Sequence, residues 1–141
     1  MEIADAIAHA RTHRNGVITT LKRDGRPQLS NIIHSVDEGG VIRISITATR
    51  AKYKNLVRDP RASLWVGGDD FWSYAVLEGE ADLSPVAASP DDATVDELVD
   101  LYRALAGEHK DWAEYRAAMV TDQRVVLRLS PTHAYGMLRP G

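Results

Sequence analysis

The sequence predicts a mainly β protein in which short antiparallel strands form a closed or nearly closed barrel, with small helices inserted between them. Five or six strand-like segments follow one another along the 141 residues. Tight-turn dipeptides separate the early segments, Asp24-Gly25 and Gly39-Gly40, and each favours a hairpin because it tolerates positive φ. The helical stretches are short, and no repeat or linker divides the chain. We therefore expect one domain over residues 1–141, with a barrel-like core.

The first elements are a short helix and a series of strands. Residues 2–13 place Ile3, Ala6, Ile7 and Ala10 at helical spacing. Residues 15–49 are rich in strand formers on both sides of the two turns. Within them, residues 42–48 alternate between apolar and polar side chains, which is typical of a half-buried strand.

The second half continues this pattern and adds two helical pieces. Residues 61–68 and 73–85 are predicted strands, and residues 91–106 are a predicted acidic amphipathic helix with Ser89 or Asp91 as its cap. A second helical piece follows around Trp112, and residues 124–138 supply the last strands.

Composition excludes several classes of protein. The chain has no cysteine, which excludes disulfides, thiolate metal sites and cysteine nucleophiles and indicates a reducing compartment, so we expect it in the cytoplasm. The net charge of −3 argues against nucleic-acid binding, which needs a basic face. The first residues have no apolar signal region, and we expect neither a signal peptide nor a membrane span.

One short stretch is strongly basic in this acidic chain. Residues 50–61 hold five basic residues and one acid, Asp59, so they carry net +4 and the other 129 residues carry −7. The stretch predicts a helix with Thr49 as N-cap that ends near Arg58, because Asp59 precedes Pro60. Arg50 and Lys52 lie in its first turn, where cations are unfavourable unless an anion neutralises them. This placement suggests a phosphate site at the start of the helix.

The alternative is a solvated helix. Arg50, Lys54 and Arg58 follow one another at i, i+4 and i+8 and would share one exposed face. The pattern of charges alone leaves both interpretations open.

The histidines give weaker indications. His9 and His13 have a spacing that can bind zinc, but no third ligand lies nearby in the sequence, so we expect a solvated helix and no metal. His34 fits either the core or a pocket. The sequence contains no recognisable catalytic triad and no Gly-rich phosphate motif, so the catalytic residues stay unknown.

Three ordered segments carry a resemblance to a known family: "DGRPQLSNI", "TRAKYKNLVRDPRASL" and "WSYAVLEGEA", with further similarity from residue 106 to 136. The chain resembles the pyridoxamine 5'-phosphate oxidase-like split-barrel flavoproteins. Within them it looks most similar to the actinobacterial branch that binds the deazaflavin F420. The resemblance implies a homodimeric split β-barrel with cofactor sites at the subunit interface.

The resemblance also implies roles for individual residues. The cofactor phosphate would be held by Arg50, Ala51, Lys52 and Asn55, and the ring would lie near Gln28, Ser30 and Asn31. The path between ring and phosphate would be lined by Ser45, Thr47 and Thr49. Trp72 and Tyr74 would reach across from the partner subunit. The oligoglutamate tail of F420 would favour surplus cations such as Lys54, Arg58 and Arg61.

The implied activity is hydride transfer from reduced F420 to an unsaturated small-molecule acceptor, because the cofactor supplies the chemistry and the protein supplies binding and orientation. Two alternatives stay open. One is an FMN-dependent oxidase or reductase of the same fold. The other is a cofactor carrier that binds F420 without turnover.

Overall fold

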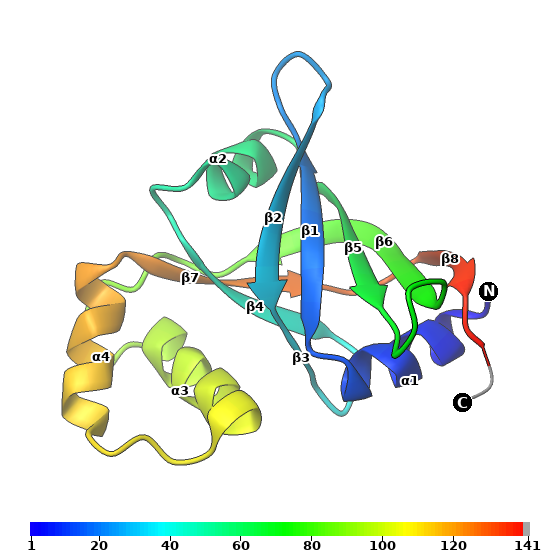
Figure 1. The fold of residues 1–141 in the computed structure, drawn as a ribbon. Coiled ribbons are helices and arrows are strands. Elements are labelled where there is room, and N and C mark those ends of the chain that lie inside the picture. The colour runs from blue at the N-terminus through cyan, green and yellow to red at the C-terminus, as the bar shows by residue number, and fades with distance from the viewer. Residues whose placement is uncertain (140–141) are drawn as a thin grey trace.

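The computed structural model describes residues 1–139 and forms an antiparallel β half-barrel with four small helices (Figure 1). The strands are β1 (Asn15–Leu21), β2 (Pro27–Ile33), β3 (Ser35–Val36), β4 (Ile42–Thr47), β5 (Arg61–Gly67), β6 (Tyr74–Leu83), β7 (Arg124–Leu129) and β8 (His133–Met137). The helices are α1 (Ile3–Thr12), α2 (Ala51–Arg58), α3 (Ala93–Ala106) and α4 (Trp112–Thr121). The predicted class and the order of elements are confirmed, with β3 as an additional short strand.

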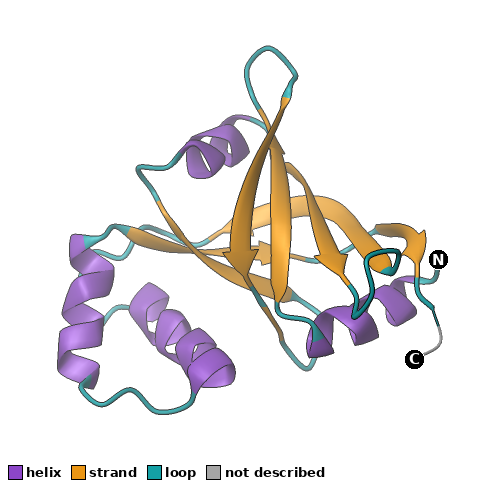
Figure 2. Ribbon diagram, viewed as in Figure 1, coloured by secondary structure: helices purple, strands orange, loops and turns teal. Residues whose placement is uncertain are grey.

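The strands join in the order β2-β1-β5-β6-β7-β4-β3, and β8 pairs with β6 outside this path. β6 is the element that connects the two halves of the barrel. Its first part pairs with β5 and β8, and its last residues, Ala81 to Leu83, pair with β7. In Figure 2 the helices lie around the strands, with α3 and α4 together on one side and α1 across one end.

Alternation of side chains builds the barrel interior. In β4 the side chains of Ile42, Ile44 and Ile46 are buried, while the intervening Arg43, Ser45 and Thr47 are half-buried. This is the alternation that the sequence predicts. The strands contribute a common core whose members include Ile18, Ile44, Leu64, Leu77 and Leu127. Burying each such side chain contributes about 1.5–3 kcal/mol to stability.

The two predicted hairpin turns form where glycine is needed. Gly25 and Gly40 have φ of 85° and 82°, which is a left-handed conformation that favours glycine. Gly25 closes the β1–β2 hairpin, whose tip is the loop that projects furthest from the barrel in Figure 1.

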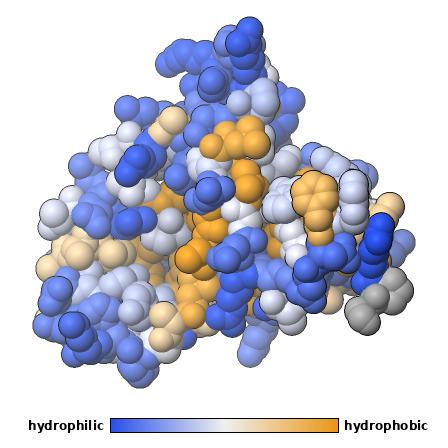
Figure 3. Space-filling model, in the orientation of Figure 1, coloured by the Kyte–Doolittle hydropathy of each residue, from blue (hydrophilic) through white to orange (hydrophobic). Residues whose placement is uncertain are grey.

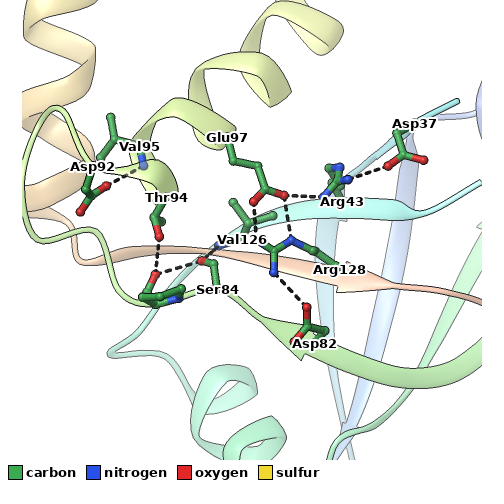
Figure 4. A network of polar contacts seen from close by, with 11 residues as sticks. Asp37, Arg43, Asp82, Ser84, Asp92, Thr94, Val95, Glu97, Val126 and Arg128 are labelled. Atoms are coloured by element: carbon green, nitrogen blue, oxygen red, sulfur yellow. Dashed lines mark hydrogen bonds and ion pairs between the residues drawn. The ribbon is translucent and has the colours of Figure 1, made fainter. Parts of the chain in front are cut away.

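An ion-pair network attaches α3 to the sheet (Figure 4). Glu97 on α3 accepts hydrogen bonds from Arg43 on β4 and Arg128 on β7. Arg43 also pairs with Asp37, and Arg128 with Asp82. These contacts hold the pKa of the Glu97 carboxyl below its usual value, with the Arg128 hydrogen bonds as the largest cause. The charges of α3 thus find partners on two neighbouring strands.

Two predicted helix caps are wrong by one residue or more. Asp92 is the N-cap of α3, and its carboxylate accepts from the N–H of Val95 at 2.8 Å, so neither Ser89 nor Asp91 fills that position. Asp92 also accepts from the N–H of Ala88 and Ser89, which is why the chain turns there. At α2 the N-cap is Arg50 instead of Thr49, and it makes no side-chain capping bond.

His34 belongs to the core. Its side chain is fully buried, and Nε2 donates to the carbonyl of Ala10 in α1 at 2.9 Å. Nδ1 has no hydrogen-bond partner within residues 1–139. Burial is the largest of the effects that lower the pKa of His34, so the imidazole is kept neutral.

Candidate cofactor site

A cavity of about 940 Å³ lies where β1, β2 and β5 face β4 and the first turn of α2. Its size suits a cofactor or a drug-sized ligand. Residues from both ends of the chain line it: Asn15, Gly16, Val17, Ser30, Asn31, Ile32, Ile33, Ser45, Ile46, Thr47, Arg50, Lys52, Trp65, Leu105 and Arg124. β2 is the edge strand of the sheet, so the cavity lies in the gap that the half-barrel leaves open.

One end of the cavity is cationic. Arg50, Lys52 and Arg124 line it, and no Asp or Glu lines it within the described part of the chain. The pKa of Lys52 is lowered, first by burial and then by the charges of Arg50 and Arg124. The three cations therefore repel one another, and an anion placed among them would relieve this repulsion.

The start of α2 adds hydrogen-bond donors beside these cations. A tight turn, in which the N–H of Arg50 donates to Thr47 at 3.0 Å, leads from β4 directly into α2. The first N–H groups of a helix have no intrahelical acceptor, and Arg50 supplies no side-chain cap. The helix start is thus suited to an anionic group.

The polar face of β4 provides the neutral part of the wall. Ser45 and Thr47 alternate with the buried Ile44 and Ile46, so their hydroxyl groups lie on the opposite side of the strand from the core. Both line the cavity. Hydroxyl groups donate and accept, so they can bond the polar atoms of a ligand that runs along β4.

The structure brings six of the twelve predicted binding residues to this cavity. These are Ser30 and Asn31 from β2, Ser45 and Thr47 from β4, and Arg50 and Lys52 at the start of α2. Ala51 and Asn55 line a neighbouring groove of about 700 Å³, together with Lys22, Arg23, Asp24, Lys54, Val57 and Arg58. Thr49 lies in the turn between β4 and α2 and does not line either space.

Gln28 and Asn55 make internal hydrogen bonds around Thr20. The hydroxyl of Thr20 accepts from Nδ2 of Asn55 at 3.1 Å and donates to Oε1 of Gln28 at 3.3 Å. Nε2 of Gln28 in turn donates to the hydroxyl of Ser30 at 3.1 Å. Through these contacts the network fixes α2 against β1 and orients Ser30, which itself lines the cavity.

Trp72 and Tyr74 lie away from the cavity. Trp72 belongs to the loop between β5 and β6, is 61% exposed, and forms an edge-to-face pair with Phe71 at 4.9 Å between ring centroids. Tyr74 begins β6 and pairs with Gly67 and Met137. Within one subunit neither residue lines the cavity.

Sequence reasoning missed Arg124, Trp65, Leu105 and Gly16. Arg124 begins β7 and pairs with Thr47, and Trp65 lies on the outer face of β5, in register with Val17. Leu105 is near the end of α3, which Arg14 holds by donating to the carbonyls of Ala104 and Leu105. No local pattern marks these residues, because only the strand order brings them together.

The comparisons with known proteins agree with this fold. The family model of pyridoxamine 5'-phosphate oxidase matches residues 3–138. The chain belongs to this family. The assignment confirms the resemblance that the three sequence segments carry, and with it the split-barrel fold.

Solved structures of the same fold are only distantly similar in sequence. A conserved hypothetical protein from Mycobacterium tuberculosis is 23% identical, with a TM-score of 0.71 over 95% of this chain and 82% of that one. An F420 reductase is 22% identical, with a TM-score of 0.69 over 91% and 94%. A pyridoxamine 5'-phosphate oxidase-related, FMN-binding protein from Nostoc punctiforme is 16% identical, with a TM-score of 0.60 over 94% and 80%. These matches show the fold and leave the choice of cofactor open.

The two histidines that have a zinc-compatible spacing, in and directly after α1, contact the end of β5 and the loop after it. His9 and His13 stack on each other, and their Nε2 atoms contact the carbonyl of Gly67 at 2.9 Å and the carboxylate of Asp69 at 3.0 Å. Residues 1–139 contain no cluster of three or more potential metal ligands. Nor does any helix within the same range have the length and apolar character needed to cross a membrane.

Proposed function

We propose that the protein binds F420 in this cavity and transfers a hydride from the reduced cofactor to an unsaturated small-molecule acceptor. The observation that carries the proposal is the cavity itself, with three cations and an uncapped helix start at one end and the hydroxyl groups of β4 beside them. Such an arrangement suits a long ligand with an anionic end and a polar chain.

The residues present fit a phosphate-bearing cofactor. The cations have no carboxylate among the cavity-lining residues, and Nε of Arg124 is buried without a hydrogen-bond partner within residues 1–139. Arg50 and Lys52 would hold the phosphate, with the N–H groups of the first turn of α2. When bound, the deazaflavin supplies hydride chemistry.

The chain's own residues would orient the cofactor. Ser45 and Thr47 would bond its polar chain, while Ser30 and Asn31 on β2 would lie beside the ring. Ser30 is oriented by Gln28, so Gln28 would act as a positioning residue. Trp65 and Leu105 supply apolar surface at the cavity, which would keep water away from the ring.

Two other functions use the same residues. An FMN-dependent oxidase or reductase of this family would use the same phosphate site, but FMN has no oligoglutamate tail for the additional cations to bind. A carrier that binds F420 without turnover needs no further residue. The groove beside α2 favours F420, because Lys22, Arg23, Lys54 and Arg58 line it with a single acid, Asp24, and a polycarboxylate tail would find cations there.

We also propose that the protein is a homodimer. One row of residues crosses the outer face of five paired strands: Asn31, Val17, Trp65, Val76 and Tyr135. Trp65 and Tyr135 are 42% and 45% exposed, and Leu29 and Ile33 on β2 are more than half exposed. Figure 3 shows apolar surface over the middle of the molecule, below the hydrophilic hairpin tip. Exposed aromatic and aliphatic side chains on one face support a subunit contact.

In such a dimer Trp72 and Tyr74 would reach the partner's cavity. The loop that carries Trp72 is fixed by Asp70, whose carboxylate accepts from the N–H groups of Trp72 and Ser73. We further propose a cytoplasmic location, because a sequence without cysteine is compatible with a reducing compartment.

A turnover assay distinguishes an F420-dependent enzyme from a carrier that only binds the cofactor. Reduced F420 is mixed with the protein and an added electron-poor alkene or quinone, and oxidation of the cofactor is followed by its absorbance. The proposal expects steady oxidation over many equivalents of cofactor per subunit. Oxidation that stops at one equivalent or does not occur, despite tight F420 binding, would identify a carrier.

A further inference from the structure

Arg124, the first residue of β7, differs from Arg128 of the same strand in its hydrogen bonding. Arg128 is fully engaged, with hydrogen bonds to both Glu97 and Asp82. Arg124, four residues earlier, has a buried Nε without a hydrogen-bond partner within residues 1–139. Its nearest carboxylate oxygen, on Asp122, is 3.9 Å from Nε, which is beyond hydrogen-bond distance. A buried arginine donor is normally satisfied, so this one calls for an acceptor.

The local backbone directs Arg124 to the cavity. The preceding residue, Gln123, has φ of 54°, a left-handed conformation that is uncommon for a residue with a side chain. The N–H of Ala48 donates to the carbonyl of Gln123 at 2.9 Å, so this turn is tied to the end of β4. Arg124 then pairs with Thr47, another residue of the cavity wall. The turn at Gln123 thus places Arg124 beside the end of β4, where both Arg124 and Thr47 line the cavity.

Arg124 also adds to the positive charge at one end of the cavity. It lies close enough to Lys52 for its charge to lower the pKa of that amine, and Arg50 has the same effect. All three residues line one cavity, whose lining within residues 1–139 includes no carboxylate, and Asp122 makes only a long contact with Arg124. A single negative charge would not balance the three cations that line this end of the cavity, even with the Asp122 carboxylate near Arg124.

We propose that Arg124 is a third anion-binding residue of the cavity, and that this end of the cavity takes a phosphate-containing group with at least two negative charges. Arg50 and Lys52 approach this group from α2, whereas Arg124 approaches it from β7. The inference rests on the proposed function for the identity of the group, which would be the phosphate end of the cofactor. The residue's role in anion binding stands independently of which cofactor is used.

Pyrophosphate is the probe that separates the two questions, because it offers several charges without any ring. Calorimetric titration of the protein without added cofactor is compared for the native chain, Arg124→Gln, Arg124→Lys and Lys110→Gln. Lys110 is exposed and lines none of the cavities described above, so its variant controls for net charge. We expect Arg124→Gln to weaken pyrophosphate binding at least about ten-fold, since charge-assisted hydrogen bonds carry this much affinity.

The other two variants separate the effect of the charge of Arg124 from that of its hydrogen-bond donors and from a general change in net charge. Arg124→Lys keeps the charge and loses the Nε donor, so its affinity should lie between those of the native chain and Arg124→Gln. Lys110→Gln should stay within about two-fold of the native chain, as expected for a distant exposed charge. Binding to Arg124→Gln within two-fold of the native chain, or no binding of pyrophosphate to the native chain, would overturn the inference.

A second measurement does not depend on any ligand. The pKa of Lys52 is followed by NMR titration of its side-chain carbon signals, and it should rise in Arg124→Gln because a neighbouring positive charge is removed. The same signals report whether the variant is folded. An unchanged Lys52 pKa in a folded variant would contradict the placement of Arg124 in the cation cluster. If pyrophosphate binds as expected and F420 does not, the inference stands and the proposed function fails.

Discussion

Lys52 is the residue whose environment departs most clearly from that of a surface lysine. Burial and two neighbouring arginines lower its pKa, and its side chain lines the cavity. Lys54, two residues further along α2, lines the neighbouring groove instead. The two lysines therefore form a matched pair, with the same chemistry and the same helix but different surroundings.

We predict that Lys52→Ala weakens cofactor binding by at least about 1 kcal/mol, since it removes a charge-assisted contact to the phosphate. Lys54→Ala should have a smaller effect. Fluorescence titration of both variants measures the difference, and thermal unfolding without cofactor provides the control for folding. Equal and negligible effects of the two substitutions would rule out a phosphate contact by Lys52.

His34 predicts a specific dependence of stability on pH. Its folded pKa is lowered by burial, whereas in the unfolded chain it takes up a proton near pH 6.5. Just below that pH the unfolded state binds more protons than the folded state. The free energy of unfolding should therefore be full above about pH 6.5 and decline below it, by up to about 1.4 kcal/mol per pH unit, until the folded-state pKa is reached.

His34→Gln isolates this contribution, because glutamine retains a donor for the carbonyl of Ala10 and does not titrate. Urea unfolding at several pH values between 5 and 7.5 should show a shallower pH dependence for the variant than for the native chain. Identical pH profiles would mean that another group, and not His34, causes the loss of stability in acid.

At the scale of elements, α3 depends on its cap and on the Glu97 network. Asp92 accepts three backbone N–H groups, from Ala88, Ser89 and Val95. We predict that Asp92→Ala destabilises the protein by about 0.5–2 kcal/mol, the usual range for loss of an N-cap. Asp91→Ala, at one of the two cap positions that the sequence predicts, should change stability by less than about 0.5 kcal/mol, as expected for an exposed residue without special contacts.

Chemical denaturation of the Asp92→Ala and Asp91→Ala variants decides which residue caps α3.

The starts of α3 and α2 show how far sequence patterns can locate a helix cap. The run "SPDDAT" holds four residues of types that favour a cap, so the pattern predicts the helix but not which residue caps it. At α2, Thr49 has a side chain suited to capping, yet the turn after β4 places Arg50 at the N-cap.

At the scale of the whole molecule, periodicity and turn residues predict the strands, and the ordered segments predict the family. The strand order is not visible in the sequence, and it is the strand order that builds the cavity. Thr47 and Arg124 are neighbours only because β4 pairs with β7. Asn55 has a polar side chain suited to a phosphate ligand, but its Nδ2 donates to Thr20 of β1 and its Oδ1 accepts from Arg58 of the same helix. Contacts between residues far apart in the sequence, such as these, can be read only from the folded structure.

The homodimer is a prediction at this scale. Ile33 on the edge strand β2 is 57% exposed and lies at the cavity, on the face proposed for the subunit contact. Sedimentation should show a dimer for the native chain and a shift toward monomer for Ile33→Asp, because a buried charge opposes association. Glu114→Gln, on the exposed start of α4, is the control. A native chain that sediments as a monomer at all concentrations would contradict the dimer.

We propose above that the cationic residues bind the phosphate and the anionic tail of F420. Paired fluorescence titrations with F420 and FMN, each at low and high salt, test it most directly. We predict tight F420 binding that weakens as salt rises, with FMN binding more weakly, because salt screens the attraction between the cations and the ligand charges. Tighter binding of FMN would contradict the assignment of F420. Binding of neither ligand would remove the cofactor from the account altogether.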